Sequence, residues 1–199
     1  MKNIVFFCCS IFSVTLIAQE TISTYEMAFF EKDPYEIQAT KPTGDNFNYY
    51  LSMQSLDGSV KKGGLKISSD NYVDFKEFLV QCKIKLNEWD STAVANNIDE
   101  LVKLIPVTYK PRLAGYFRYS DWHFDKSVKL TPKFYRTVGK SSLLITTGEL
   151  TASDNEYIDC ENLVFAFTSE EIDNLLEGLK PENIIKHFTA QDSKDELFK

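Results

Sequence analysis

The stretch FNYYLSMQSLDGSVKKGGLKIS, residues 47–68, decides the fold. Apolar and polar side chains alternate over residues 47–56, and an alternation of period two is typical of a half-buried β-strand. Asp57-Gly58 then predicts a two-residue hairpin turn, because glycine tolerates positive φ. We therefore expect residues 59–67 to return as an antiparallel strand, with a β-bulge at Gly63-Gly64.

The hydrophobic period changes from two to about 3.6 directly after this hairpin. Asp70 or Asn71 can cap a helix by accepting a hydrogen bond from an unpaired backbone N–H group. One narrow apolar stripe follows at helical spacing, with polar side chains on either side of it. It consists of Phe75, Phe78, Leu79, Cys82, Leu86, Trp89 and Ala93. The pattern predicts one long amphipathic helix that lies across a sheet.

The flanking segments supply further strands and a helical C-terminus. Residues 22–30 predict a strand, and residues 98–105 predict either a short helix or a strand. Thr168-Ser169-Glu170-Glu171 matches a capping box, which predicts a helix that ends at residues 178–181. One or two more helical turns are expected around residues 184–188, before a frayed tail at 190–199. Four further strands are expected near residues 113–124, 127–137, 142–150 and 157–167.

These elements predict an α+β fold. Short connections between the strands favour a mostly antiparallel sheet, with the long amphipathic helix and the C-terminal helical segment packed on it. The length suits a single globular domain spanning residues 20–199.

The first nineteen residues have the pattern of a secretory signal peptide. Lys2 supplies a positive charge, residues 4–17 are largely apolar, and Ala18 offers a small residue for cleavage. An uncleaved anchor and a buried N-terminal strand are the alternatives. The Lys-Asn start and the Ala-Gln end resemble exported proteins of the Bacteroidetes group, a resemblance that carries no function. We expect a periplasmic or secreted protein without a membrane-spanning segment after cleavage.

Charge and cysteine content narrow the class of protein. The formal net charge is −7, and loss of Lys2 would make the chain more acidic, which argues against non-specific nucleic-acid binding. Cleavage would leave two cysteines, Cys82 and Cys160. They could form a disulfide in an oxidising compartment, or they could remain as two buried thiols.

Asp121, His123 and Asp125 form the only candidate catalytic or metal-binding group that the sequence suggests. Alternate residues of a strand share a face, so these three would project together, with Trp122 and Phe124 on the other side. They could serve a metal-dependent hydrolase, or they could be a solvated strand end. The common hydrolase motifs His-Glu-x-x-His and Gly-x-Ser-x-Gly do not occur in the chain. The sequence therefore favours a non-enzymatic protein and predicts no cofactor.

A basic, aromatic segment supplies the second functional hypothesis. Residues 103–140 carry nine lysines or arginines against two aspartates, whereas residues 149–199 carry thirteen acidic side chains against four lysines. Such strands could bind an anionic glycan, a lipid head group or an acidic protein surface. They could also face solvent, neutralise the acidic C-terminal helices, or dock an assembly subunit on an envelope complex. The candidate ligand-binding residues are Arg118, Lys129, Lys133 and Tyr135.

Overall fold

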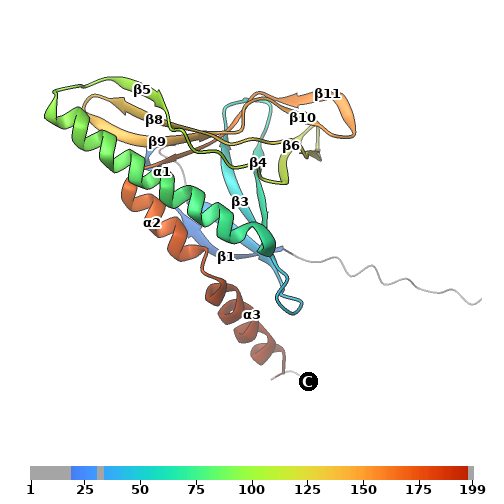
Figure 1. Ribbon diagram of the computed structural model, residues 1–199. Helices are drawn as coiled ribbons and strands as arrows, with labels where there is room; N and C mark the ends of the chain where they lie inside the picture. The colour runs from blue at the N-terminus through green and yellow to red at the C-terminus, as the bar shows by residue number, and fades with distance from the viewer. Residues whose placement is uncertain (1–18, 31–33, 197–199) are drawn as a thin grey trace, which may run out of the picture.

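The computed structural model describes residues 19–30 and 34–196 and confirms the α+β class, with a mostly antiparallel sheet and three helices (Figure 1). The strands of the N-terminal half are β1 (Gln19–Tyr25), β2 (Tyr35–Thr40), β3 (Asn48–Ser55), β4 (Lys62–Ser68) and β5 (Leu101–Leu104), and a short 3-10 turn η1 (Ala28–Phe30) follows β1. The later strands are β6 (Leu113–Arg118), β7 (Asp121–Asp125), β8 (Thr131–Thr137), β9 (Lys140–Thr146), β10 (Leu150–Ala152), β11 (Asn155–Cys160) and β12 (Leu163–Phe167). The helices are α1 (Ser69–Ala95), α2 (Ser169–Gly178) and α3 (Pro181–Glu196).

The main sheet is branched. Its longest path runs β5-β8-β9-β12-β3-β4-β6-β7, and β2 pairs with β3 beside this path and carries β1 on its other side. One edge of β3 serves both neighbours, because residues 49–51 pair with β2 whereas Gln54 and Ser55 pair with β12. β10 and β11 form a separate two-stranded sheet.

The helices cover one face of the main sheet, where the core lies. The predicted stripe of α1 is buried apart from Trp89, which is partly buried, and α1 packs against β4, β8 and β9. α2 begins at the predicted capping box: Thr168 Oγ1 accepts from the Glu171 N–H, and the Glu171 carboxylate accepts from the Thr168 N–H. α2 lies beside α1 and contacts β1 and β12, and α3 continues away from the sheet (Figure 1).

The central hairpin has a longer loop than its Asp57-Gly58 signal predicts. β3 and β4 pair antiparallel as expected, but residues 56–61 connect them, and the Asp57 side chain stabilises this loop through the backbone N–H of Ser59. The predicted bulge at Gly63-Gly64 is wrong. Gly63 pairs with Met53 and Gly64 with Ser52 in continuous register.

Several predicted boundaries need correction. Residues 113–124 form two strands, since Tyr119 and Ser120 both take positive φ and make a tight turn without the glycine that usually marks one. Residues 157–167 likewise belong to β11 and β12, and residues 101–104 form a strand rather than a short helix. β2, which the sequence analysis missed, alternates buried and exposed side chains at its start. The tail predicted to fray at residue 190 remains helical to Glu196.

The predicted signal peptide lies outside the described residues except for Gln19, the first residue of β1. Within residues 19–30 and 34–196, no helix combines the length and the apolar character needed to cross a membrane.

Cys82 and Cys160 are both free and fully buried, so the disulfide alternative is not formed. Cys82 lies within the buried stripe of α1, and Cys160 is the last residue of β11. Burial raises the pKa of the Cys82 thiol to about 12, and it also raises the pKa of Cys160. Both thiols are therefore protonated in the folded protein at neutral pH.

We predict that these two thiols react slowly in the native protein. Alkylation at neutral pH, followed by peptide mass spectrometry, should leave Cys82 and Cys160 unmodified until denaturant is added. A thiol that is held neutral when folded but ionises when unfolded destabilises the fold at high pH. The Cys82 contribution should therefore be intact below about pH 9 and decline toward pH 12. Rapid native labelling, or a Cys82–Cys160 disulfide, would contradict this prediction.

Candidate functional site

The face of the sheet opposite the helices carries an open trough over β2, β3, β4, β6 and β7. On β3 and β4 alternate side chains are buried under the helices, which turns Tyr50, Ser52, Gly64 and Lys66 toward this second face. The trough encloses about 390 Å³ and has a mixed polar and apolar lining. Its size lies within the range of small-molecule sites.

Small residues on neighbouring strands form the floor of the trough. Ser52 pairs with Gly64, Gly64 with Gly115, and Gly115 with Phe124, so one cross-strand row runs from β3 to β7. A Cβ atom on Gly64 would lie 2.3 Å from the Leu51 carbonyl oxygen, and one on Gly115 would lie 2.9 Å from the Phe124 ring. Gly64 therefore requires glycine, whereas a side chain at Gly115 would displace the Phe124 ring, and the row leaves space that larger side chains would fill.

An aromatic platform stands at the β7 end of this row. Trp122 and Phe124 occupy alternate positions of β7 and stack with ring centroids 6.3 Å apart and an interplanar angle of 16°. Phe117 on β6 contacts Trp122 edge to face. Trp122 is 45% exposed and Phe124 is 42% exposed. Stacked aromatic rings that are this open to solvent offer a flat apolar surface to a ligand.

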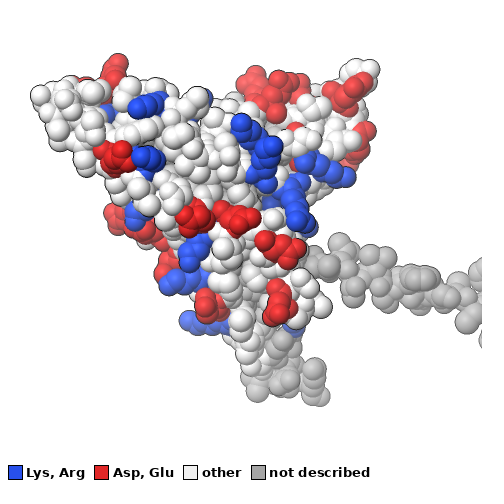
Figure 2. Space-filling view, in the orientation of Figure 1, with Lys and Arg blue, Asp and Glu red and all other residues white. Residues whose placement is uncertain are grey.

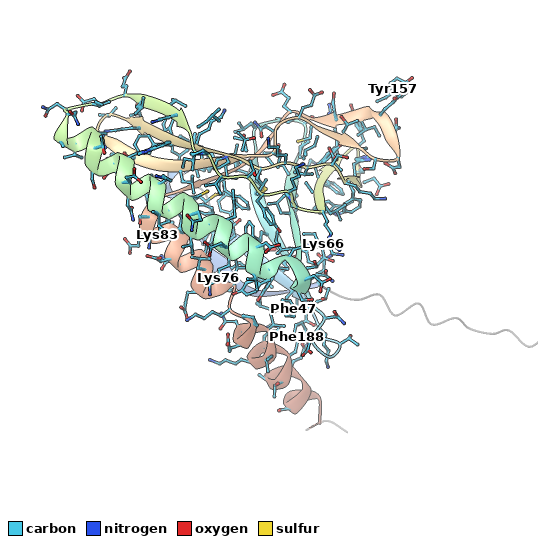
Figure 3. All side chains as sticks on the ribbon, in the orientation of Figure 1. Phe47, Lys66, Lys76, Lys83, Tyr157 and Phe188 are labelled. Atoms are coloured by element: carbon cyan, nitrogen blue, oxygen red, sulfur yellow. The ribbon has the colours of Figure 1, made fainter. Side chains whose placement is uncertain are left out.

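Basic and amide side chains flank the platform. Gln38, Tyr50 and Lys66 are neighbours in a second cross-strand row, and the Lys66 ammonium lies 5.9 Å from the centre of the Tyr50 ring. Burial raises the pKa of Tyr50, so its hydroxyl is a neutral donor. Lys62 lies in a third row, opposite Phe117. Figure 2 shows basic side chains over the region that Figure 1 labels β4 and β6. Figure 3 places Lys66 near the N-terminal end of α1.

The predicted basic patch does not form as one surface. Arg118 is on β6 and Lys133 and Tyr135 are on β8, and β9, β12, β3 and β4 lie between these strands. The two strands are not neighbours, because β6 pairs with β4 and β7, whereas β8 pairs with β5 and β9. Lys129 is exposed on the connection before β8.

Arg118 is occupied within the fold. Its guanidinium lies 2.7 Å from the Asp159 carboxylate and 3.6 Å from that of Asp57. It also donates to the Asp159 carbonyl oxygen. These bonds tie β6 to β11 and to the β3–β4 loop. Arg118 therefore holds the fold together rather than presenting its charge to a ligand.

Asp121, His123 and Asp125 have separate partners. Asp121 Oδ1 accepts from the Trp122 N–H, and His123 Nε2 is 3.2 Å from the Arg118 carbonyl oxygen. The buried Asp125 carboxylate accepts from two backbone N–H groups. Among the described residues, no three His, Cys, Asp or Glu side chains gather closely enough to hold a metal ion. The geometry therefore gives the hydrolase hypothesis no support.

Sequence reasoning missed Gly64, Gly115 and Lys66, and it assigned Trp122 and Phe124 only to the face opposite the acidic group. That assignment of faces is consistent with the structure, since Trp122 and Phe124 line the trough. One signal was available: two aromatic side chains at positions i and i+2 of a strand are typical of a stacking surface when the other face is occupied. The glycines could be recognised only once the strand pairing was known.

Comparison of the chain with protein-family models, with curated proteins and with solved structures found no match.

We predict that Asp125 stabilises the fold. Its carboxylate accepts from the Ser127 N–H at 2.6 Å and from the Thr151 N–H at 3.1 Å, which joins β7 to β10. Asp125→Ala should lower the free energy of unfolding in urea by about 2 kcal/mol, because it leaves two partly buried donors without this partner. Asp121→Ala is the matched control, since this exposed side chain bonds only to its neighbour, and it should change stability by less than about 0.5 kcal/mol. Equal stability of both variants would contradict this role.

Proposed function

We propose that this chain is an exported binding protein that holds an acidic glycan in the trough and does not alter it chemically. Export rests on the predicted signal peptide in residues 1–19. The glycan assignment rests chiefly on one observation, the stacked and exposed Trp122–Phe124 pair beside Lys62 and Lys66.

The aromatic platform favours a sugar ring. One side of a pyranose ring presents C–H groups and packs flat on an aromatic face, while its hydroxyl groups point outward to hydrogen-bonding side chains. Trp122 and Phe124 supply the flat face. Gln38, Ser52 and Tyr50 line the same trough and offer amide and hydroxyl groups, which both donate and accept. Stacking on the two aromatic rings would contribute less to the binding of a lipid head group or a protein surface.

The charges favour an acidic ligand. Three lysines, Lys61, Lys62 and Lys66, line the trough against one acidic side chain, Glu36, although the whole chain is acidic. A local excess of positive charge in a concave site attracts anions and raises their association rate. Carboxylate groups of a uronic acid chain would meet these ammonium groups while the ring stacks on Trp122.

Binding without turnover accords with the titratable groups nearby. Glu36 is the only carboxylate that lines the trough among the described residues, and neither histidine does so. Glycosidic bond cleavage ordinarily needs two carboxyl groups placed on either side of the bond. The trough therefore has the groups for recognition rather than those for hydrolysis.

We predict binding of oligogalacturonate and weaker binding of its methyl ester, which keeps the sugar backbone but removes the charge. Isothermal titration calorimetry should show at least about a fivefold loss of affinity for Trp122→Ala, since one aromatic contact contributes about 1 kcal/mol or more. Lys66→Glu should weaken binding by a similar factor, and added salt should weaken wild-type binding.

Two variants serve as matched controls. Tyr157→Ala removes an aromatic side chain that is 87% exposed at the outer end of the β10–β11 hairpin, well away from Lys66 (Figure 3). Lys129→Glu reverses an exposed charge outside the trough. Both should bind like the wild type. Equal binding of the acid and its ester, loss of binding with Lys129→Glu but not Lys66→Glu, or binding only to anionic vesicles would contradict the proposal.

A further inference from the structure

Among the described residues, the main sheet ends at three strands, β7, β1 and β5, and other elements contact the first two. At the β7 edge, the Ser153 N–H from the β10–β11 hairpin donates to the Phe124 carbonyl oxygen at 2.8 Å. At the β1 edge, α2 and α3 pack against the strand, and His187 of α3 lies 3.0 Å from the Glu20 carboxylate. The third edge is β5, which ends the strand order and lies along the upper left margin in Figure 1.

The backbone of β5 directs hydrogen-bonding groups away from the sheet. The Ile105 N–H donates to the Pro132 carbonyl oxygen just before β8. In an antiparallel pair, the residues that bond to the neighbour alternate along the strand, so Leu101 and Lys103 also bond toward β8. Val102 and Leu104 consequently point their N–H and C=O groups outward. An open row of such groups is a template for another strand.

The same strand exposes apolar side chains. Val102 is 60% exposed and Leu104 is 61% exposed, and both lie on the face away from α1. Tyr135 is the cross-strand partner of Val102 and contacts Phe29 at 5.8 Å between ring centres, which extends the apolar surface onto η1. Lys103 points to the other face, where its ammonium lies 4.1 Å from the centre of the Trp89 ring. β5 itself therefore places no charge on this face, although edge strands are often protected by one, and the charge beside it is that of Lys133 on β8, the cross-strand partner of Leu104.

The charges along this segment are self-complementary. Asp99 and Glu100 precede the strand, and Lys103 lies near its end. When two copies pair antiparallel about a two-fold axis at Val102, Lys103 of one copy lies diagonally across from Asp99 of the other, on the α1 face, and the two Lys103 side chains are diagonal neighbours as well. The pairing forms the attractive Lys103–Asp99 contact twice and the Lys103–Lys103 approach once, and it brings the two Val102 side chains together. We infer that β5 pairs with β5 of a second copy, which joins the two sheets into one continuous sheet.

Sedimentation velocity of the purified protein over a range of concentrations tests this inference. The wild type should form a dimer, and Val102→Glu should halve the measured mass because it places charge at the two-fold axis. Val73→Glu is the matched control, since Val73 is 69% exposed on α1, and this variant should remain a dimer. Far-ultraviolet circular dichroism and thermal melting establish that each variant is folded.

Cross-linking gives a second readout that does not depend on affinity. Val102→Cys should form an intermolecular disulfide on mild oxidation, whereas Val73→Cys should not, and the buried Cys82 and Cys160 give little background. Reversing both charges, Lys103→Asp with Asp99→Lys, should restore a dimer that Lys103→Asp alone weakens. A wild type that is monomeric at all concentrations, or a dimer that survives Val102→Glu, would overturn the inference.

Discussion

β3 joins the two parts of the sheet, because two strands divide one of its edges between them. A strand edge presents a single row of backbone donors and acceptors, so β2 and β12 can both pair with it only at different residues. The sheet consequently forks, and α2 contacts a strand of each branch, β1 and β12. α2 starts two residues after β12 ends, and its Glu171 carboxylate also accepts from the Ala28 N–H of η1 at 2.6 Å. These connections hold α2 in place between the two branches of the sheet.

One face of the sheet is covered by the helices and forms the core, whereas the other face carries the trough. The helices bury apolar side chains of β3 and β4 on one side, which supplies hydrophobic free energy for folding. The aromatic rings of Trp122 and Phe124 lie on the other side and stay nearly half exposed, so they contribute only part of the free energy that full burial would supply. Their stacking over Gly115 is the feature on which the proposed binding of a glycan rests.

Periodicity within single segments predicted the class of fold, the α1 stripe and the α2 cap, because those features depend on residues three or four positions apart. It did not predict which strands are neighbours. The Tyr119-Ser120 turn lacks glycine and divided an expected strand in two. The basic patch was grouped by closeness in sequence, whereas the trough gathers Gln38, Gly64 and Trp122 through pairings across the sheet. Such long-range contacts produce no periodic pattern within a single segment of the sequence.

The position of the two surfaces relates the proposed binding function to the inferred association. The trough lies toward the β7 end of the strand order, and β5 lies at the opposite end. A second copy on β5 would therefore leave both troughs open. A glycan is a repeating polymer, so one chain could occupy two troughs of the same dimer, and the second contact would form at a high effective concentration. An affinity that is modest at each aromatic platform would then suffice for firm attachment to a polymeric ligand.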